Sequence, residues 1–128
     1  ECWIGTPLRL GTLTGALESV TVLCWLLGCA RGTGQELADL HGSRLRAFLS
    51  RTIDTTVRGV LYEAGGTVAE SVLAAGAGVA RGVAERNAIP LEILRADPGE
   101  PEAWLGEAHG ALEALLGEGA LSARRGGP

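Results

Sequence analysis

The chain has 128 residues, which is enough for one domain with a single core. Its 15 acidic and 11 basic residues give a formal net charge of −4, without the basic excess of a nucleic-acid-binding surface. The longest apolar run, Val22 to Leu27, is far shorter than the ~20 residues that a membrane span requires, and no secretory signal pattern opens the sequence. We therefore predict a cytoplasmic protein that binds neither nucleic acid nor membrane.

The residue usage is biased. All 11 basic residues are arginine, methionine is absent, and the 20 glycines are about twice the usual share of roughly 7%. The sequence opens on Cys2-Trp3-Ile4, which is typical of a strand already under way. We therefore expect the chain to begin inside a longer polypeptide.

The three cysteines, Cys2, Cys24 and Cys29, cannot all pair with one another and form no Cys-x-x-Cys motif. Reduced, mostly buried thiols are the favoured interpretation. A metal site of Cys24, Cys29 and His41 is an alternative that lacks a fourth ligand. Catalysis by Cys29 is a second alternative, but no His or Lys adjoins it in sequence. We predict no metal.

Four short apolar runs, rich in branched residues, each precede a stretch with helical patterning. The runs cover residues 2–5, 20–27, 57–62 and 89–94. Strands that alternate with helices predict a parallel sheet covered on both faces. We therefore expect an α/β fold, a doubly wound parallel sheet that is incomplete and has about four βα units. Ligands of such sheets lie at the carboxyl ends of the strands.

Helix starts and stops divide the intervening stretches. The first helix is expected over about 7–18, and the motifs Thr33-x-x-Glu36 and Thr67-x-x-Glu70 have the form of capping boxes that start two more. Gly42 is expected to bend or divide the second helix. The last helix follows the turn at 97–101. The domain should cover 1–121, followed by a disordered tail over 122–128.

Tyr62 and Glu63 have a functional and a structural interpretation each, whereas the histidines and tryptophans are interpreted as structural. Tyr62, the only tyrosine, ends a predicted strand: its phenol reaches a ligand, or it is a half-buried aromatic with its hydroxyl in water. Glu63 is a base or a ribose contact, or a solvated turn carboxylate. His41 and His109 are interpreted as surface positions on helices. The three tryptophans are expected to pack in the core.

The order and spacing of three segments resemble a known family. These are Gly5-Thr6-Pro7-Leu8 with the leucine-rich stretch to Val22, then Val57–Gly65, and finally Asn87–Pro98. The segments resemble the middle of the extended and atypical short-chain dehydrogenase/reductases, an NAD-dependent-epimerase-like superfamily with an NAD(P)-binding Rossmann fold. The resemblance covers about residues 2–98.

The resemblance implies a site for NAD or NADP. It puts the adenine end of the cofactor near Thr6 and the strand end at 26–28, and the nicotinamide near 62–64 and 95–96. The implied cofactor-binding residues are Thr6, Leu26, Leu27, Gly28, Tyr62, Glu63, Ala64, Arg95 and Ala96.

The chain departs from the family pattern in three ways. Thr6 stands where the family usually has Asp, and the glycine-rich βαβ unit that holds the pyrophosphate is missing. The Tyr-x-x-x-Lys pair is also missing, and the chain contains no lysine. The resemblance therefore implies weak cofactor binding in this chain alone and no competent catalytic pair.

Two functions remain open from the sequence. The first is a dinucleotide-binding-type domain that is a fragment of a larger protein. The alternative is a non-enzymatic α/β protein-interaction module, and exposed sheet edges could also drive self-association. In the family's strand order, two missing strands would separate residues 2–5 from 20–27, so the first run should be unpaired or re-paired.

Overall fold

A computed structural model of the chain describes residues 4–7, 9, 11, 17 and 20–126. Within these residues, strands and helices alternate along the chain, which confirms the α/β class. In chain order the elements are β1 (Val22–Trp25), α1 (Gly34–Leu40), α2 (Ser43–Thr52), β2 (Gly59–Glu63), α3 (Glu70–Asn87), β3 (Leu91–Leu94) and α4 (Pro101–Gly126). No described helix is long and apolar enough to cross a bilayer.

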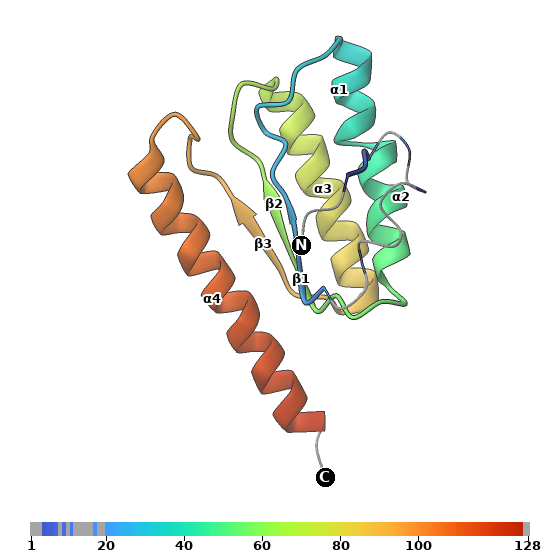
Figure 1. Cartoon of the computed structure of the whole chain (residues 1–128), viewed down its shortest axis with the longest axis vertical. Coiled ribbons are helices and arrows are strands. Elements are labelled where there is room, and N and C mark those ends of the chain that lie inside the picture. The colour runs from blue at the N-terminus through green and yellow to red at the C-terminus, as the bar shows by residue number, and fades with distance from the viewer. Residues whose placement is uncertain (1–3, 8, 10, 12–16, 18–19, 127–128) are drawn as a thin grey trace.

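The strands form one parallel sheet in the order β1-β2-β3. Val22 lies opposite Gly59, and Val60 lies opposite Leu91. Helices α1, α2 and α3 lie on one side of this sheet and α4 lies on the other (Figure 1). The chain is therefore a three-layer α/β arrangement, as the alternating pattern predicts.

The first predicted strand is not among these elements. Residues 1–3 lie outside the described part of the chain, and Ile4 and Gly5 have no strand structure. The Ile4 side chain is 94% exposed. The described residues thus form three strands where four were expected. Most of the helix expected over 7–18 also lies outside the described residues.

The face covered by α2 and α3 contains the larger core. Strand residues alternate between the two faces, so Trp25, Val60 and Tyr62 point toward these helices while their neighbours point away. The Trp25 ring lies against Phe48, with ring centroids 5.5 Å apart. The buried members of this cluster are Leu17, Trp25, Leu45, Phe48, Leu49, Val57, Val60, Tyr62, Ala77, Ala80 and Val83.

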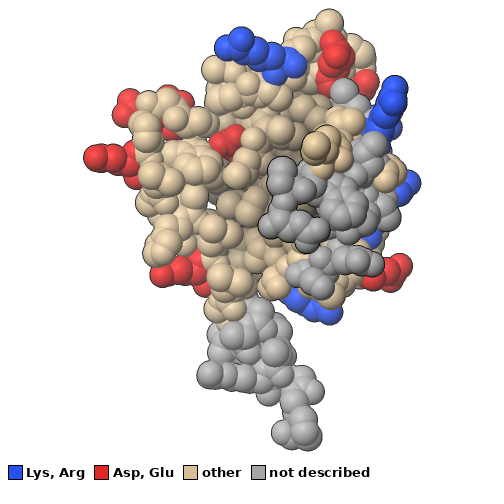
Figure 2. Space-filling model, in the orientation of Figure 1, with Lys and Arg blue, Asp and Glu red and all other residues tan. Residues whose placement is uncertain are grey.

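The other face is covered by α4, which packs chiefly against β2 and β3. Its core is smaller and joins Leu61 and Leu94 of the sheet to Ala108 and Leu115 of the helix. Cys24 shares this face with Leu61, its partner in the register, yet its side chain is exposed. In Figure 2, acidic side chains gather over α4 at the left, and the surface beside it carries few charges.

The Thr33 capping box is confirmed. The Thr33 hydroxyl accepts a hydrogen bond from the Glu36 N–H (3.1 Å), and the Glu36 carboxylate accepts one from the Thr33 N–H (3.0 Å). These bonds hold the pKa of the Glu36 carboxyl below its usual value. Gly42 separates α1 from α2, as expected.

The second predicted capping box is wrong. Helix α3 begins at Glu70 after Ala69, and no side chain caps it. The backbone just before α3 makes a tertiary contact instead: the Val68 N–H donates a hydrogen bond to the Gly28 carbonyl at 3.0 Å. A tertiary hydrogen bond to the end of β1 therefore sets this loop in place of the local Thr67 motif.

The end of α3 and the extent of α4 complete the fold. Helix α3 ends at Asn87, as predicted, and Ala88 closes it in the left-handed conformation at φ 52°. The backbone expected to be a tail from 122 onward continues α4 as far as Gly126. The disorder expected for residues 122–128 in solution stays a prediction.

Candidate functional site

The carboxyl ends of the three strands bring most of the predicted site residues to one edge of the sheet. Because the strands are parallel, residues that follow different strands meet at the same edge. Residues 26–28 follow β1, residues 62–64 end or follow β2, and Arg95 and Ala96 follow β3. Most of the residues that the sequence singles out thus gather at the edge where ligands of α/β sheets usually lie.

Glycine backbones fill much of that edge. A side chain on Gly28 would collide with the Gly65 carbonyl oxygen, and one on Gly66 would collide with the Gly28 carbonyl. Gly66 also has a φ of +140°, which other residues rarely adopt. A Cβ on Gly65 would lie 2.7 Å from the Ala96 carbonyl oxygen. Between β1 and β2, the chain's own loops therefore occupy the space at the strand ends.

Glu63 is a buried carboxylate at the end of β2, not the solvated turn residue of the simpler interpretation. Its side chain is 4% exposed. One carboxylate oxygen accepts the Gly28 N–H at 2.8 Å, and the other accepts the Trp104 indole N–H at 2.7 Å. Both oxygens thus have a donor from the protein. Glu63 ties the end of β1 to α4 through the sheet.

Tyr62 points to the opposite face and is fully buried, so its hydroxyl is not in water. The hydroxyl lies 2.7 Å from Nδ1 of His41, and Nε2 of His41 lies 3.0 Å from the Leu27 carbonyl oxygen. Because a carbonyl only accepts, His41 carries its proton on Nε2, and Nδ1 accepts the Tyr62 O–H. Gly76 of α3 leaves the room that the phenol needs.

His41 is therefore a core residue, not a surface residue as expected. Only 1% of it is exposed, whereas His109 lies on the surface of α4, as predicted. Burial lowers the pKa of His41, although its bond to Leu27 and the Glu63 charge oppose the shift. Burial and the Glu63 charge raise the pKa of Tyr62. Both groups are neutral near pH 7 and face no solvent.

The two described cysteines, Cys24 and Cys29, lie at the surface and do not form the alternative metal site with His41. Cys24 and Cys29 are both exposed, which contradicts the expected burial. Both ring nitrogens of His41 already have partners, so His41 is not available as a ligand. Among the described residues, no three His, Cys, Asp or Glu side chains are placed to hold a metal ion.

Thr6 meets the end of β1 at a small cavity. The cavity has a volume of about 210 Å³ and is lined by Thr6, Pro7, Leu27, Arg31, Glu36, Leu37 and Leu40. Thr6 and Leu27, two of the residues that the family resemblance singles out, thus line the same cavity. Ligand pockets usually measure ~300 Å³ or more, so this cavity could enclose at most a part of a dinucleotide. Arg31 adds a positive charge beside it.

Sequence reasoning missed the partners that occupy Tyr62 and Glu63. Two signals were available. The alternation along β2 puts Glu63 on the same face as the apolar Leu61, which indicates an inward carboxylate. A glycine at position 76, inside a helix, indicates close approach by a large side chain.

Neither a protein-family model, nor a curated protein, nor a solved structure matches the chain. Tyr62 and Glu63 hold the sheet and its helices together, while Thr6, Leu27 and Arg31 surround the cavity at the end of β1.

Proposed function

We propose that this chain is one half of a doubly wound, dinucleotide-binding-type domain that binds NAD or NADP without a competent catalytic pair. One observation carries the proposal. The parallel order β1-β2-β3, with α1, α2 and α3 crossing on one face, has the arrangement of a βαβαβ half of such domains. The family resemblance of the sequence points the same way.

The proposed cofactor site lies at the carboxyl end of β1. Dinucleotides bind where the strand order reverses, next to the first strand of each half. Strand β1 is at the edge of the described sheet, so a second half would join there. The cavity beside Thr6 and Leu27 is at this end of β1, and the Arg31 guanidinium is available to a phosphate.

The contacts of Tyr62 and Glu63 support binding without redox chemistry. The Tyr62 hydroxyl is bonded to His41, and both Glu63 oxygens accept protein N–H groups. The chain has no lysine to lower the pKa of a tyrosine. The nearest charged side chains at the cavity, Arg31 and Glu36, are suited to contacts with phosphate and hydroxyl groups.

The test is a titration of the 128-residue chain with NADH and NADPH, followed by ligand fluorescence and by thermal unfolding. We expect saturable binding below ~1 mM and a rise in Tm with ligand concentration. Arg31→Ala should weaken binding about fivefold, because it removes one charge from the phosphate contact. Arg86→Ala removes the same charge near the end of α3 and should leave binding unchanged.

Absence of binding by a folded chain would contradict the proposal. The alternative would then be a non-enzymatic α/β interaction module. One observation favours that alternative: β3 is also an edge strand, and a long groove follows it.

A further inference from the structure

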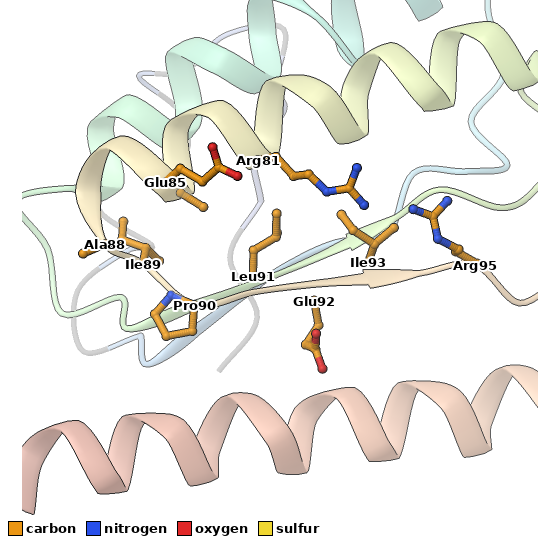
Figure 3. Close-up of a pocket in the computed structure, with 10 residues that line it drawn as sticks. Arg81, Glu85, Ala88, Ile89, Pro90, Leu91, Glu92, Ile93 and Arg95 are labelled. Atoms are coloured by element: carbon orange, nitrogen blue, oxygen red, sulfur yellow. The ribbon is translucent and has the colours of Figure 1, made fainter.

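A groove runs between α3 and the free edge of β3. Its volume is about 590 Å³, and it opens along the side of the sheet opposite to β1. Figure 3 shows Leu91 and Ile93 pointing up into it toward α3, with Pro90 at its start. Glu92 points the other way, toward α4. The floor of the groove is thus the apolar side of an edge strand.

The backbone of β3 leaves hydrogen-bonding groups free along this groove. The Pro90 and Leu94 carbonyls accept N–H groups of Val60 and Ala64 in and beside β2. In a parallel pair a strand bonds its neighbour through alternate residues, so Glu92 also faces β2. The N–H and C=O groups of Leu91 and Ile93 therefore point outward. Among the residues that the structure describes, none pairs with them.

Two arginines share the carboxyl end of the groove. Arg81 of α3 and Arg95 at the end of β3 extend toward the same space over Ile93 (Figure 3). Neither guanidinium has a hydrogen bond or an ion pair within the described part of the chain. Glu85 lies farther along α3, toward the other end of the groove. The end over Ile93 is therefore positively charged.

We propose that this groove binds an extended peptide segment that carries an acidic side chain. The segment adds to β3 as a further strand and bonds to the outward backbone groups of Leu91 and Ile93. Its inward side chains are apolar and lie on the floor of the groove. Its carboxylate lies between Arg81 and Arg95.

Charge complementarity selects this occupant over a second copy of the chain. The edge strand of a second copy carries no inward acidic side chain for the arginines, because its Glu92 points away from the groove and Glu85 belongs to α3. An acidic side chain on a separate segment meets both guanidinium groups at once. The site lies on the edge opposite to β1, so it is independent of the proposed cofactor site.

The probe is a fluorescein-labelled octapeptide of alternating Thr and Val with one Glu, blocked at both ends. Two versions place the Glu near either end and so cover both strand directions. Binding is followed by fluorescence anisotropy. We expect saturable binding below ~1 mM for one version, and about fivefold weaker binding of the same peptide with Gln for Glu.

Matched variants separate charge from fold. Arg81→Gln with Arg95→Gln should abolish the preference for Glu over Gln, while Arg86→Gln on the same helix should keep it. Amide hydrogen exchange supplies a second readout. The Leu91 and Ile93 amides should exchange fast in the free chain and slow on binding, whereas Glu92, already paired with β2, should change little.

Three results would overturn the proposal. The first is no saturable binding by either version, and the second is an unchanged Glu preference in the double variant. The third is protection of Leu91 and Ile93 in the absence of peptide that grows with protein concentration, which would indicate a dimer at this edge.

Discussion

The two faces of the sheet differ in how completely they are covered. The face under α2 and α3 has a continuous core in which side chains from all three strands pack against both helices. The face under α4 has a core of four buried residues, Leu61, Leu94, Ala108 and Leu115, over β2 and β3. On this second face, the Cys24 side chain of β1 is exposed.

This difference indicates that a parallel sheet can be ordered chiefly by the packing on one of its faces. Parallel sheets are usually covered by helices on both faces, so that their strands are buried on both sides. Here the face under α2 and α3, which we call the closed face, supplies most of the apolar burial. The Glu63 contact with Trp104 holds α4 on the other face. Equivalent substitutions on the two faces should therefore lower the free energy of unfolding by different amounts.

The largest expected effect comes from truncating a leucine on each face. Leu45→Ala, on the closed face, should cost about 3–5 kcal/mol of unfolding free energy, because rigid neighbours keep the cavity open. Leu115→Ala should cost about 2–3 kcal/mol, because a single helix can shift to fill the space. Urea unfolding of both variants measures the difference. Equal costs would show that the two faces are equally constrained.

A glycine pair tests how tightly the closed face is packed. Gly76→Ala would place a methyl group against the Tyr62 hydroxyl and should cost about 1–3 kcal/mol. Gly78→Ala, two residues along α3, meets no atom within 4 Å and should stabilise the helix by up to ~1 kcal/mol. Thermal unfolding of the two variants shows whether each substitution raises or lowers the stability of the chain. If both stabilised the chain, the phenol would not be confined as described.

The buried His41 predicts how the closed face responds to pH. Its pKa is lowered by burial from 6.5, so below pH ~6.5 the unfolded chain takes up a proton that the folded chain does not. Stability should therefore be complete above that pH and fall below it, by up to ~1.4 kcal/mol per pH unit from this group. Tyr62, with a raised pKa, predicts a second loss above pH ~10.

The two histidines supply the control for this pH dependence. Urea midpoints at pH 7.5 and 5.5 are compared for the parent chain, His41→Gln and His109→Gln. Replacing the exposed His109 should keep the loss at pH 5.5, whereas replacing His41 should reduce it. An identical loss in all three chains would assign the pH dependence to the carboxylates alone.

The smallest energetic effect is expected on the uncovered part of the α4 face. Iodoacetamide should label Cys24 in the folded chain and change the unfolding free energy by less than ~0.5 kcal/mol, because the thiol lies outside the core. Partial burial raises the pKa of this thiol from 9.0, so the labelling rate should still rise with pH near 9. The Cys24→Ser variant identifies the signal. No labelling before unfolding would mean that this face is covered.

Local patterns predicted the elements that local interactions build. The Thr33 capping box, the division at Gly42 and the end of α3 at Asn87 each depend on residues within a few positions of one another. The positions of the strands at 22–25, 59–63 and 91–94 follow from apolar runs. These features could be predicted because their causes are written in short stretches of sequence.

The meeting of the candidate residues at one edge of the sheet could be predicted, but their contacts there could not. Glu63 is buried because Gly28 and Trp104, at 35 and 41 residues' distance, supply N–H groups to it. His41 is buried because Tyr62 and Leu27 meet it across the closed face. The Thr67 motif failed for a similar reason, since a bond from Val68 to Gly28 sets that loop. Periodicity carries no information about such distant partners.

The interlocked glycines at the strand ends have a consequence for how this fold can diversify. Loops at this edge are normally where α/β proteins accept insertions and acquire new specificities. Here any side chain larger than hydrogen at Gly28 or Gly66 would meet a backbone carbonyl of the neighbouring loop. A change in one loop therefore requires a matching change in the other. Sequence variation that alters recognition should accumulate first along β3 and α3, where single substitutions leave the interlocked loops intact.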